Sequence, residues 1–136
     1  MSKGMTGMNG ARGFVVLEDR FEDRFFLCRA IRECFPDAAI EEFVFSEEAF
    51  AFLKEQKDRK DLCVFVDVRL PGMDGLDFIR LCFEQIYAAN GPSPEFIVVS
   101  GVIGPDERGA IEEDERVKAF LPKPIIRDTL RAVVEG

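Results

Sequence analysis

The 136-residue chain contains no histidine. Imidazole metal ligands, histidine general bases and phosphohistidine chemistry are therefore excluded within the chain itself. Any metal ion must be held by oxygen atoms or by cysteine thiolates. The length is that of one domain with a single buried core, and 47% of the residues are hydrophobic, as in ordinary globular proteins.

The sequence has four cysteines but no CxxC pair. Each cysteine lies in an apolar pattern, where a free thiol behaves as a small hydrophobic group. The pattern predicts that the cysteines are reduced core residues, namely Cys28, Cys34, Cys63 and Cys82. It also predicts a cytoplasmic location for the protein. A reactive thiol is the less favoured alternative.

Long apolar runs and a surplus of positive charge are also missing. No run approaches the roughly 18 residues that a membrane helix needs. Residues 1–13 lack the apolar centre of a signal peptide, and we interpret residues 1–12 as a disordered leader or an engineered remnant. The net charge of −8 argues against direct binding of nucleic acid or an anionic membrane by the domain itself.

Strand-like and helix-like patterns alternate along the rest of the chain. Apolar runs rich in β-branched and aromatic residues predict buried strands at 13–17, 40–45, 62–66, 95–99 and 117–121. Helical patterns fill the gaps, at about 22–35, 46–57, 76–86, 105–115 and from 125 onward. Ser46 and Asp74 are expected to cap the second and third helices. The alternation predicts an α/β fold with a doubly wound, five-stranded parallel sheet and five helices.

Polar residues stand just after four of the predicted strands. Glu18 and Asp19 follow the first strand, Asp67 the third, Ser100 the fourth and Lys123 the fifth. All of these residues are expected at the C-terminal edge of the sheet, where doubly wound folds bind their ligands. An acid after so apolar a strand as the third costs free energy unless it is paired or solvated. The sequence therefore predicts one acidic pocket at this edge.

The residue types in this pocket suit phosphoryl transfer. Clustered carboxylates attract a hard cation, and Mg²⁺ prefers oxygen ligands and is commonly shared with a phosphate. Lys123 supplies a compact positive charge for phosphate oxygens, and Ser100 adds a neutral donor. In-line transfer needs mainly positioning and charge neutralisation, and an aspartate such as Asp67 can serve as the nucleophile.

The motifs around these residues resemble the receiver domains of bacterial two-component response regulators. The resemblance covers about residues 13–134, and its most specific part is VDVRLPGMDG at 66–75. Weaker parts follow in the right order after the right strands: VVLED at 15–19, VSG at 99–101 and FLPKP at 120–124. The resemblance implies a receiver domain over 13–136 with a flavodoxin-like sheet of strand order 2-1-3-4-5.

The resemblance also implies a role for each residue of the switch. Asp67 is expected to be the phosphoacceptor, Ser100 the switch hydroxyl and Lys123 the lysine that pairs with the phosphoryl group. Phe120 stands at the position of a rotating aromatic switch residue. The Lys123–Pro124 peptide bond is expected to be cis.

A magnesium ion is the cofactor that the resemblance implies. Asp19 is expected to bind Mg²⁺ directly and Glu18 through water, together with Asp67 and the backbone carbonyl of Arg69. Glu18 departs from the commoner aspartate at its position, which lengthens the reach of the carboxylate. The acid-rich segment 104–115 also departs from the usual pattern, so the fourth helix is expected to be short, mobile or shifted.

The implied function is a signalling switch rather than a turnover enzyme. The expected phosphodonor is a histidine kinase or a histidine phosphotransfer protein, and the output is expected through a downstream protein or a covalently linked effector domain. A homodimer is also compatible with the sequence.

Two other functions stay open at the level of the sequence. An aspartyl-phosphate phosphatase usually needs a second aspartate two residues after its nucleophile, and Arg69 stands there instead. A receiver-like module that works without phosphate is the weaker alternative, because the acceptor, the acids and the lysine are all present.

Overall fold

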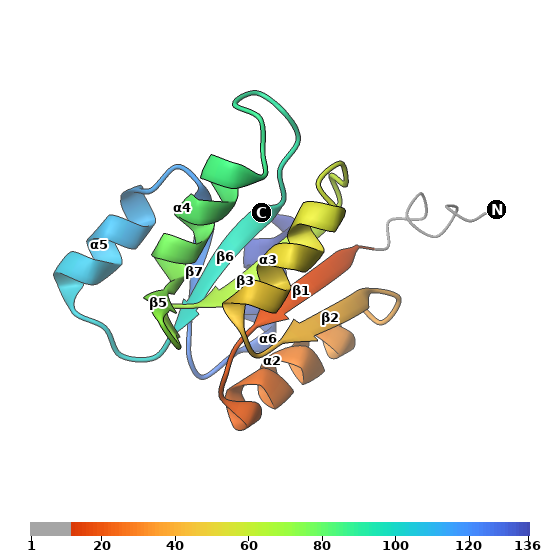
Figure 1. Ribbon diagram of the computed structural model, residues 1–136. Coiled ribbons are helices and arrows are strands. Elements are labelled where there is room, and N and C mark those ends of the chain that lie inside the picture. Colours follow the sequence, from red (N-terminus) through yellow and green to blue (C-terminus); the bar gives the residue numbers. More distant parts are fainter. Residues whose placement is uncertain (1–11) are drawn as a thin grey trace.

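The computed structural model describes residues 12–136, and Figure 1 shows a central sheet with helices on both of its faces. The sheet has five strands in the order β2-β1-β3-β6-β7, and every neighbouring pair is parallel. The predicted α/β class and the strand order 2-1-3-4-5 are therefore confirmed. The strands are β1 (Gly13–Leu17), β2 (Ala39–Phe43), β3 (Leu62–Asp67), β6 (Glu95–Ser100) and β7 (Val117–Pro122).

Four helices connect the strands in this part of the chain, and a fifth follows β7. They are α2 (Phe21–Cys34), α3 (Ser46–Glu55), α4 (Gly75–Gln85), α5 (Pro105–Glu113) and α6 (Arg127–Glu135). The interpretation of residues 1–12 as a leader concerns a segment that lies outside the described residues, apart from Arg12. No helix of residues 12–136 is long and apolar enough to cross a membrane.

Each face of the sheet has its own hydrophobic core. Successive side chains of a strand point to opposite faces, so Phe14 and Val16 of β1 pack with α2 and α6, whereas Val15 and Leu17 pack with α3 and α4. This two-sided burial explains why the central strands are continuous apolar runs without alternating polar residues. It also leaves the strand ends as the natural places for polar groups.

Three local features differ from or add to the predictions. The second strand ends at Phe43 instead of residue 45, because its partner β1 ends at Leu17, which pairs with Phe43. Ser46 is the first residue of α3 and not its N-cap, so that prediction is wrong. A two-stranded hairpin, β4 (Arg69–Leu70) with β5 (Met73–Asp74), was not expected. Its turn contains Gly72 with a φ of 83°, a conformation that favours glycine.

Three of the four free cysteines are buried, as predicted for core thiols. Burial raises the pKa of each of these thiols to about 12, so they stay protonated and unreactive at neutral pH. They are Cys28, Cys63 and Cys82. Cys34 is half-buried, and its thiol donates to the carbonyl oxygen of Arg127.

Candidate functional site

The register of the sheet brings the predicted polar residues to one edge. Leu17 pairs with Val66, so Glu18 and Asp67 come next on neighbouring strands. Ser100 pairs with Pro122, so Lys123 follows directly beside the end of β6. The backbone N–H of Lys123 donates to the carbonyl oxygen of Ser100 at 2.8 Å, which fastens the two strand ends together.

The carboxylates of Glu18, Asp19 and Asp67 form a compact acidic cluster. Each offers an oxygen atom, and these atoms lie within 4.8 Å of one another. Glu18 and Asp67 are buried, with 2% and 5% of their surface exposed, whereas Asp19 is half-buried. Such a set of clustered oxygen atoms fits Mg²⁺ or a similar hard cation.

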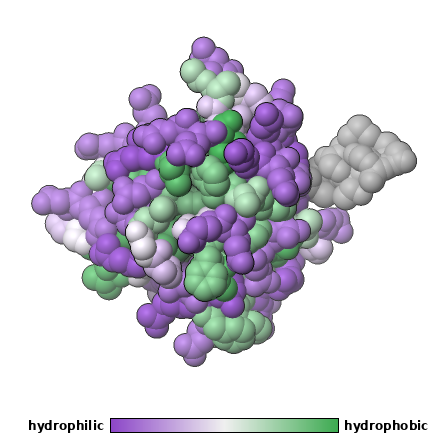
Figure 2. All heavy atoms as spheres, viewed as in Figure 1, coloured by the Kyte–Doolittle hydropathy of each residue, from purple (hydrophilic) through white to green (hydrophobic). Residues whose placement is uncertain are grey.

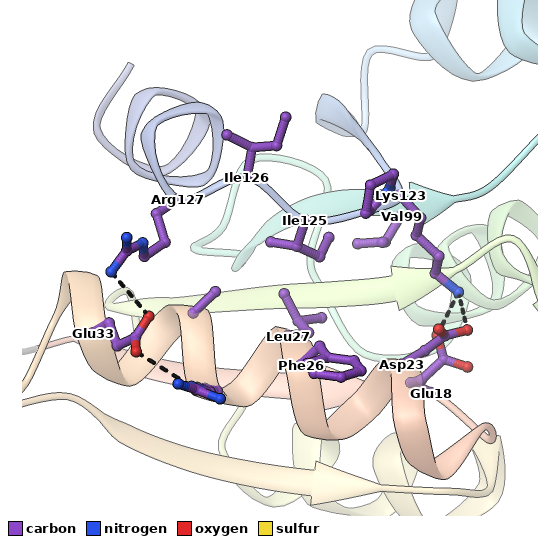
Figure 3. Close-up of a pocket in the computed structure, with 13 residues that line it drawn as sticks. Glu18, Asp23, Phe26, Leu27, Glu33, Val99, Lys123, Ile125, Ile126 and Arg127 are labelled. Carbon is purple, nitrogen blue, oxygen red and sulfur yellow. Dashed lines mark hydrogen bonds and ion pairs between the residues drawn. The ribbon is translucent and has the colours of Figure 1, made fainter.

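Lys123 is the cation that this structure places against the acids. Its ammonium nitrogen lies 2.9 Å from Glu18 Oε1 and 3.3 Å from Asp67 Oδ2. A third carboxylate, Asp23 on α2, is slightly closer at 2.8 Å. Figure 3 shows the Lys123 side chain pointing toward Glu18 and Asp23. The Lys123–Pro124 peptide bond is cis, as the resemblance implied.

Burial and mutual repulsion shape the charges of this cluster. Burial, assisted by the neighbouring Asp67, raises the pKa of Glu18 to about 7, although the hydrogen bond from Lys123 acts in the opposite direction. Burial alone would lower the pKa of Lys123, but the hydrogen bonds to Asp23 and Glu18 outweigh it, and that pKa is raised. The lysine therefore stays charged, whereas Glu18 changes its charge near neutral pH.

The loop after β3 holds the Asp67 carboxylate in place. The backbone N–H of Arg69 donates to Asp67 Oδ1 at 3.3 Å. Gly75 lies so close that a Cβ atom there would collide with the carbonyl oxygen of Asp67. Asp74 caps α4 as predicted, since its side chain accepts a hydrogen bond from the Asp77 N–H at 2.8 Å.

The side chain of Arg69 turns away from the acidic cluster. Its guanidinium donates two hydrogen bonds to Glu107 on α5, at 2.7 and 2.9 Å. A planar, bidentate pair of this kind fixes orientation as well as charge. Arg69 therefore contributes its backbone to the acidic pocket, while its side chain links that pocket to α5.

Two predicted switch residues lie on neighbouring strands but in different surroundings. Ser100 is buried at the end of β6, beside the start of the loop that leads to α5. Phe120 of β7 is half-buried and packs against the core on the α3–α4 face, not in the acidic pocket. The guanidinium carbon of Arg108 lies 4.6 Å from the centre of the Phe120 ring, a cation–π contact that connects Phe120 to α5.

Some residues of the site were not predicted from the sequence. Asp23 is an acid in the first turn of α2, where acidic residues are common, so its sequence position gave no specific signal. Arg24 donates to the carbonyl oxygen of Glu18 at 3.0 Å and ties α2 to the pocket. No sequence signal indicated that Glu107 and Arg108 of α5 would reach Arg69 and Phe120.

A groove of about 660 Å³ begins at the acidic pocket and runs beside α2. Glu18, Asp23 and Lys123 line it at the pocket, and Figure 3 shows it continuing between α2 and the start of α6. Its apolar lining includes Phe26, Leu27, Ala30, Ile125 and Ile126.

Exposed aromatic side chains extend this apolar surface along α2. Phe21, Phe25 and Phe26 each have at least half of their surface exposed, and the first two rings stack on each other. In Figure 2, hydrophobic side chains gather at the lower end of the molecule, where Figure 1 shows the start of α2.

Solved structures with the same fold are mostly response regulator receiver domains. A receiver protein from Pseudomonas putida is 25% identical, with 92% of this chain and 96% of that chain covered and a TM-score of 0.73. The REC domain of AraT, a response regulator from Geobacillus stearothermophilus, is 26% identical, with 92% and 91% covered and a TM-score of 0.67. The resemblance to receiver domains is therefore confirmed.

The same fold also occurs in a solved structure with a different name. A structure from Rhodopirellula baltica that is named adenylate cyclase is 22% identical, with 92% of this chain and 85% of that chain covered and a TM-score of 0.69; it shares the fold. No family model matches the sequence, and no curated protein matches it either.

Proposed function

We propose that this chain is a receiver domain that works as a phosphorylation switch, with Asp67 as the phosphoacceptor. The observation that carries the proposal is the meeting of three carboxylates and Lys123 at one edge of the sheet. The acids suit a cation and the lysine suits an anion, and a phosphoryl group in transfer needs both kinds of partner. The receiver fold of the chain supports the same conclusion.

The proposed step transfers a phosphoryl group from a phosphohistidine to Asp67. A carboxylate oxygen of Asp67 attacks phosphorus, the P–N bond of the donor breaks, and its electron pair stays on the imidazole nitrogen. The Arg69 N–H and Lys123 hold the two oxygens of Asp67, so the nucleophile is already oriented. Lys123 also offers its charge to the phosphoryl oxygens.

Mg²⁺ is the cofactor of the proposed reaction. Glu18, Asp19, Asp67 and the backbone carbonyl of Arg69 would hold it, and this all-oxygen donor set fits a hard cation. When bound, it supplies positive charge that neutralises the phosphate oxygens during transfer. The ionised form of Glu18 is needed for this role, although burial disfavours that form in the metal-free protein.

The proposed output is a change in the surface formed by α5, β7 and α6. A phosphoryl group adds negative charge next to Lys123, and Ser100 then donates its hydroxyl proton to a phosphoryl oxygen. Phe120 turns in the same transition and alters its contact with Arg108 on α5. A downstream protein or a linked effector domain that prefers one of the two surfaces would shift the equilibrium between them.

The proposed donor is a histidine kinase or a histidine phosphotransfer protein in the cytoplasm. Such a donor must bring its imidazole to Asp67 and bury part of its own surface beside the pocket. The groove along α2 supports this docking, because it begins at Glu18 and Lys123 and has an apolar lining. The exposed rings of Phe21 and Phe25 enlarge the apolar area that a donor could cover.

In this proposal the domain catalyses only its own phosphorylation and dephosphorylation. An aspartyl-phosphate phosphatase has less support, because Arg69 stands where its acid–base aspartate would be. The side chain of Arg69 is engaged by Glu107. A phosphate-independent module is the alternative that the following experiment separates.

Incubation with acetyl phosphate tests the proposal by intact mass. We expect one added phosphoryl group in the presence of Mg²⁺, and none without Mg²⁺ or in Asp67→Asn. Asp58→Asn is a matched control, because Asp58 is an exposed acid in the turn after α3, at the opposite edge of the sheet. A folded wild-type protein that gains no phosphoryl group and binds no beryllofluoride would contradict the proposal and favour the phosphate-independent module.

A further inference from the structure

The shortest hydrogen bond of Lys123 to a carboxylate goes to a residue outside the acidic cluster. Asp23 Oδ2 lies 2.8 Å from the ammonium nitrogen, compared with 3.3 Å for Asp67 Oδ2. The Asp23 side chain is 31% exposed, whereas that of Asp67 is 5% exposed. In the unmodified protein, the lysine therefore interacts more closely with an acid at the rim of the pocket than with the predicted acceptor.

The first turn of α2 holds Asp23 at this rim. Arg24 donates to the carbonyl oxygen of Glu18 and so fixes the start of the helix against the end of β1. Arg20 lies 3.4 Å from the same Asp23 oxygen that Lys123 binds. The Arg24 contact places the turn that carries Asp23 beside the pocket, and Figure 3 shows Asp23 and Glu18 reaching the Lys123 ammonium from the α2 side.

We propose that Asp23 is a positioning residue that holds the Lys123 ammonium at the α2 side of the pocket. There the lysine competes less with a cation for Asp67, and its ammonium group stays at this position until the negative charge of a phosphoryl group attracts it. This inference rests on the proposed function and deepens it. Asp23 itself would touch neither the metal ion nor the phosphoryl group.

Removal of the Asp23 charge is expected to change two affinities in opposite directions. In Asp23→Asn, Lys123 moves toward Glu18 and Asp67 and competes with Mg²⁺ for these carboxylates. Mg²⁺ is therefore expected to bind about threefold to fivefold more weakly, which is the size of effect expected for one partly exposed charged hydrogen bond. With saturating Mg²⁺, the phosphoryl analogue beryllofluoride binds tighter by a similar factor of about three to five, because no acid at the rim competes for the lysine. A role in folding alone would weaken both.

The test compares Asp23→Asn with Glu22→Gln. Glu22 is exposed on the same helical turn and loses the same charge, but it does not hydrogen-bond to Lys123. Amide NMR titrations with MgCl₂ give the metal affinity and report whether the fold is intact, and ¹⁹F NMR gives the affinity for beryllofluoride. Equal affinities in the two variants, or a loss of both affinities in Asp23→Asn, would overturn the proposal.

A double-mutant cycle shows whether Asp23 acts through Lys123. In a Lys123→Met background, Asp23→Asn is expected to leave the Mg²⁺ affinity unchanged relative to Glu22→Gln. A loss that persists in this background would overturn the proposal, because Asp23 would then act on the cation directly. Absence of Mg²⁺ binding in the wild type would instead refute the proposed function, and this inference with it.

Discussion

In metal-free buffer, Asp67→Asn is expected to increase the free energy of unfolding. The substitution removes one of three carboxylates whose oxygen atoms lie within 4.8 Å of one another, and it changes the volume of the side chain very little. Residues that serve a binding site commonly cost stability in the absence of the ligand. The acidic cluster of this domain is expected to follow that rule.

The magnitude follows from three opposing contributions. At an effective dielectric constant of about 20, two unit charges about 4.8 Å apart, the upper limit within the cluster, repel by about 3.5 kcal/mol. Glu18 and the more exposed Asp19 together therefore repel Asp67 by about 3.5–7 kcal/mol. On the same scale, the attraction to Lys123 at 3.3 Å is about 5 kcal/mol, which nearly cancels the repulsion. The cost of burying a carboxylate that is only 5% exposed remains. We therefore expect a net gain of about 1–2 kcal/mol in Asp67→Asn.

The gain should depend on pH because Glu18 titrates near neutrality. Its pKa is raised from 4.5 to about 7, so its contribution to wild-type stability is complete below pH 4.5 and is lost as the pH rises through 7. Asp67 causes part of this increase, and Asp67→Asn should therefore lose less stability over the same range. The advantage of the variant is expected to be larger at about pH 8.5 than at about pH 6.

Urea unfolding followed by circular dichroism measures these free energies, since the chain contains no tryptophan for fluorescence. Millimolar Mg²⁺ should reverse the order, because it stabilises the wild type by binding and the variant lacks one of its ligands. Asp58→Asn should stay close to the wild type in both buffers. An Asp67→Asn protein that is less stable than the wild type without metal at high pH would refute the reasoning.

Three further predictions concern the metal site and the loop after β3. Mg²⁺ affinity should rise with pH through about 7, the pKa of Glu18, because binding requires its ionised form, and calorimetric titrations that give a constant affinity would contradict this. Gly75→Ala should lower the free energy of unfolding in urea by about 1–3 kcal/mol, because the new methyl group collides with the Asp67 carbonyl oxygen; wild-type stability would show that the loop relaxes freely. Glu107→Gln should lengthen the phosphoryl lifetime by about twofold to fivefold, because it frees the Arg69 guanidinium to lie over the phosphoryl group. That lifetime is measured by the decay of the phosphorylated mass, and Arg69→Ala should abolish the effect; a gain that persists with Arg69→Ala would exclude this explanation.

The parts of the site that could be predicted from the sequence all follow strands directly. Glu18 and Asp67 come immediately after buried apolar runs, and Lys123 follows the half-buried strand β7. A parallel sheet brings such positions to one edge whatever the details of packing. The central strands β1 and β3 were predictable because burial on both faces leaves no polar residue within the runs 13–17 and 62–66.

The parts that could not be predicted depend on how helices rotate against the sheet. Asp23 reaches Lys123 only because the first turn of α2 presents its carboxylate toward the pocket, and Glu107 reaches Arg69 only because α5 begins beside the hairpin of β4 and β5. Local patterns do not determine such rotations. The prediction of Ser46 as a cap was wrong because α3 begins one residue earlier than its polar pattern suggested.

The attachment of α5 has a consequence for the effect of ionic strength. Ile111 is the only fully buried side chain of α5, and burial of one isoleucine contributes about 1.5–3 kcal/mol. Two other contacts, Arg69 with Glu107 and Arg108 with the Phe120 ring, carry charges at the surface. Salt screens such contacts but hardly affects a hydrophobic core. Added salt should thus loosen α5 while the sheet stays intact, so that the proposed signalling face would respond to the ionic medium as well as to phosphate.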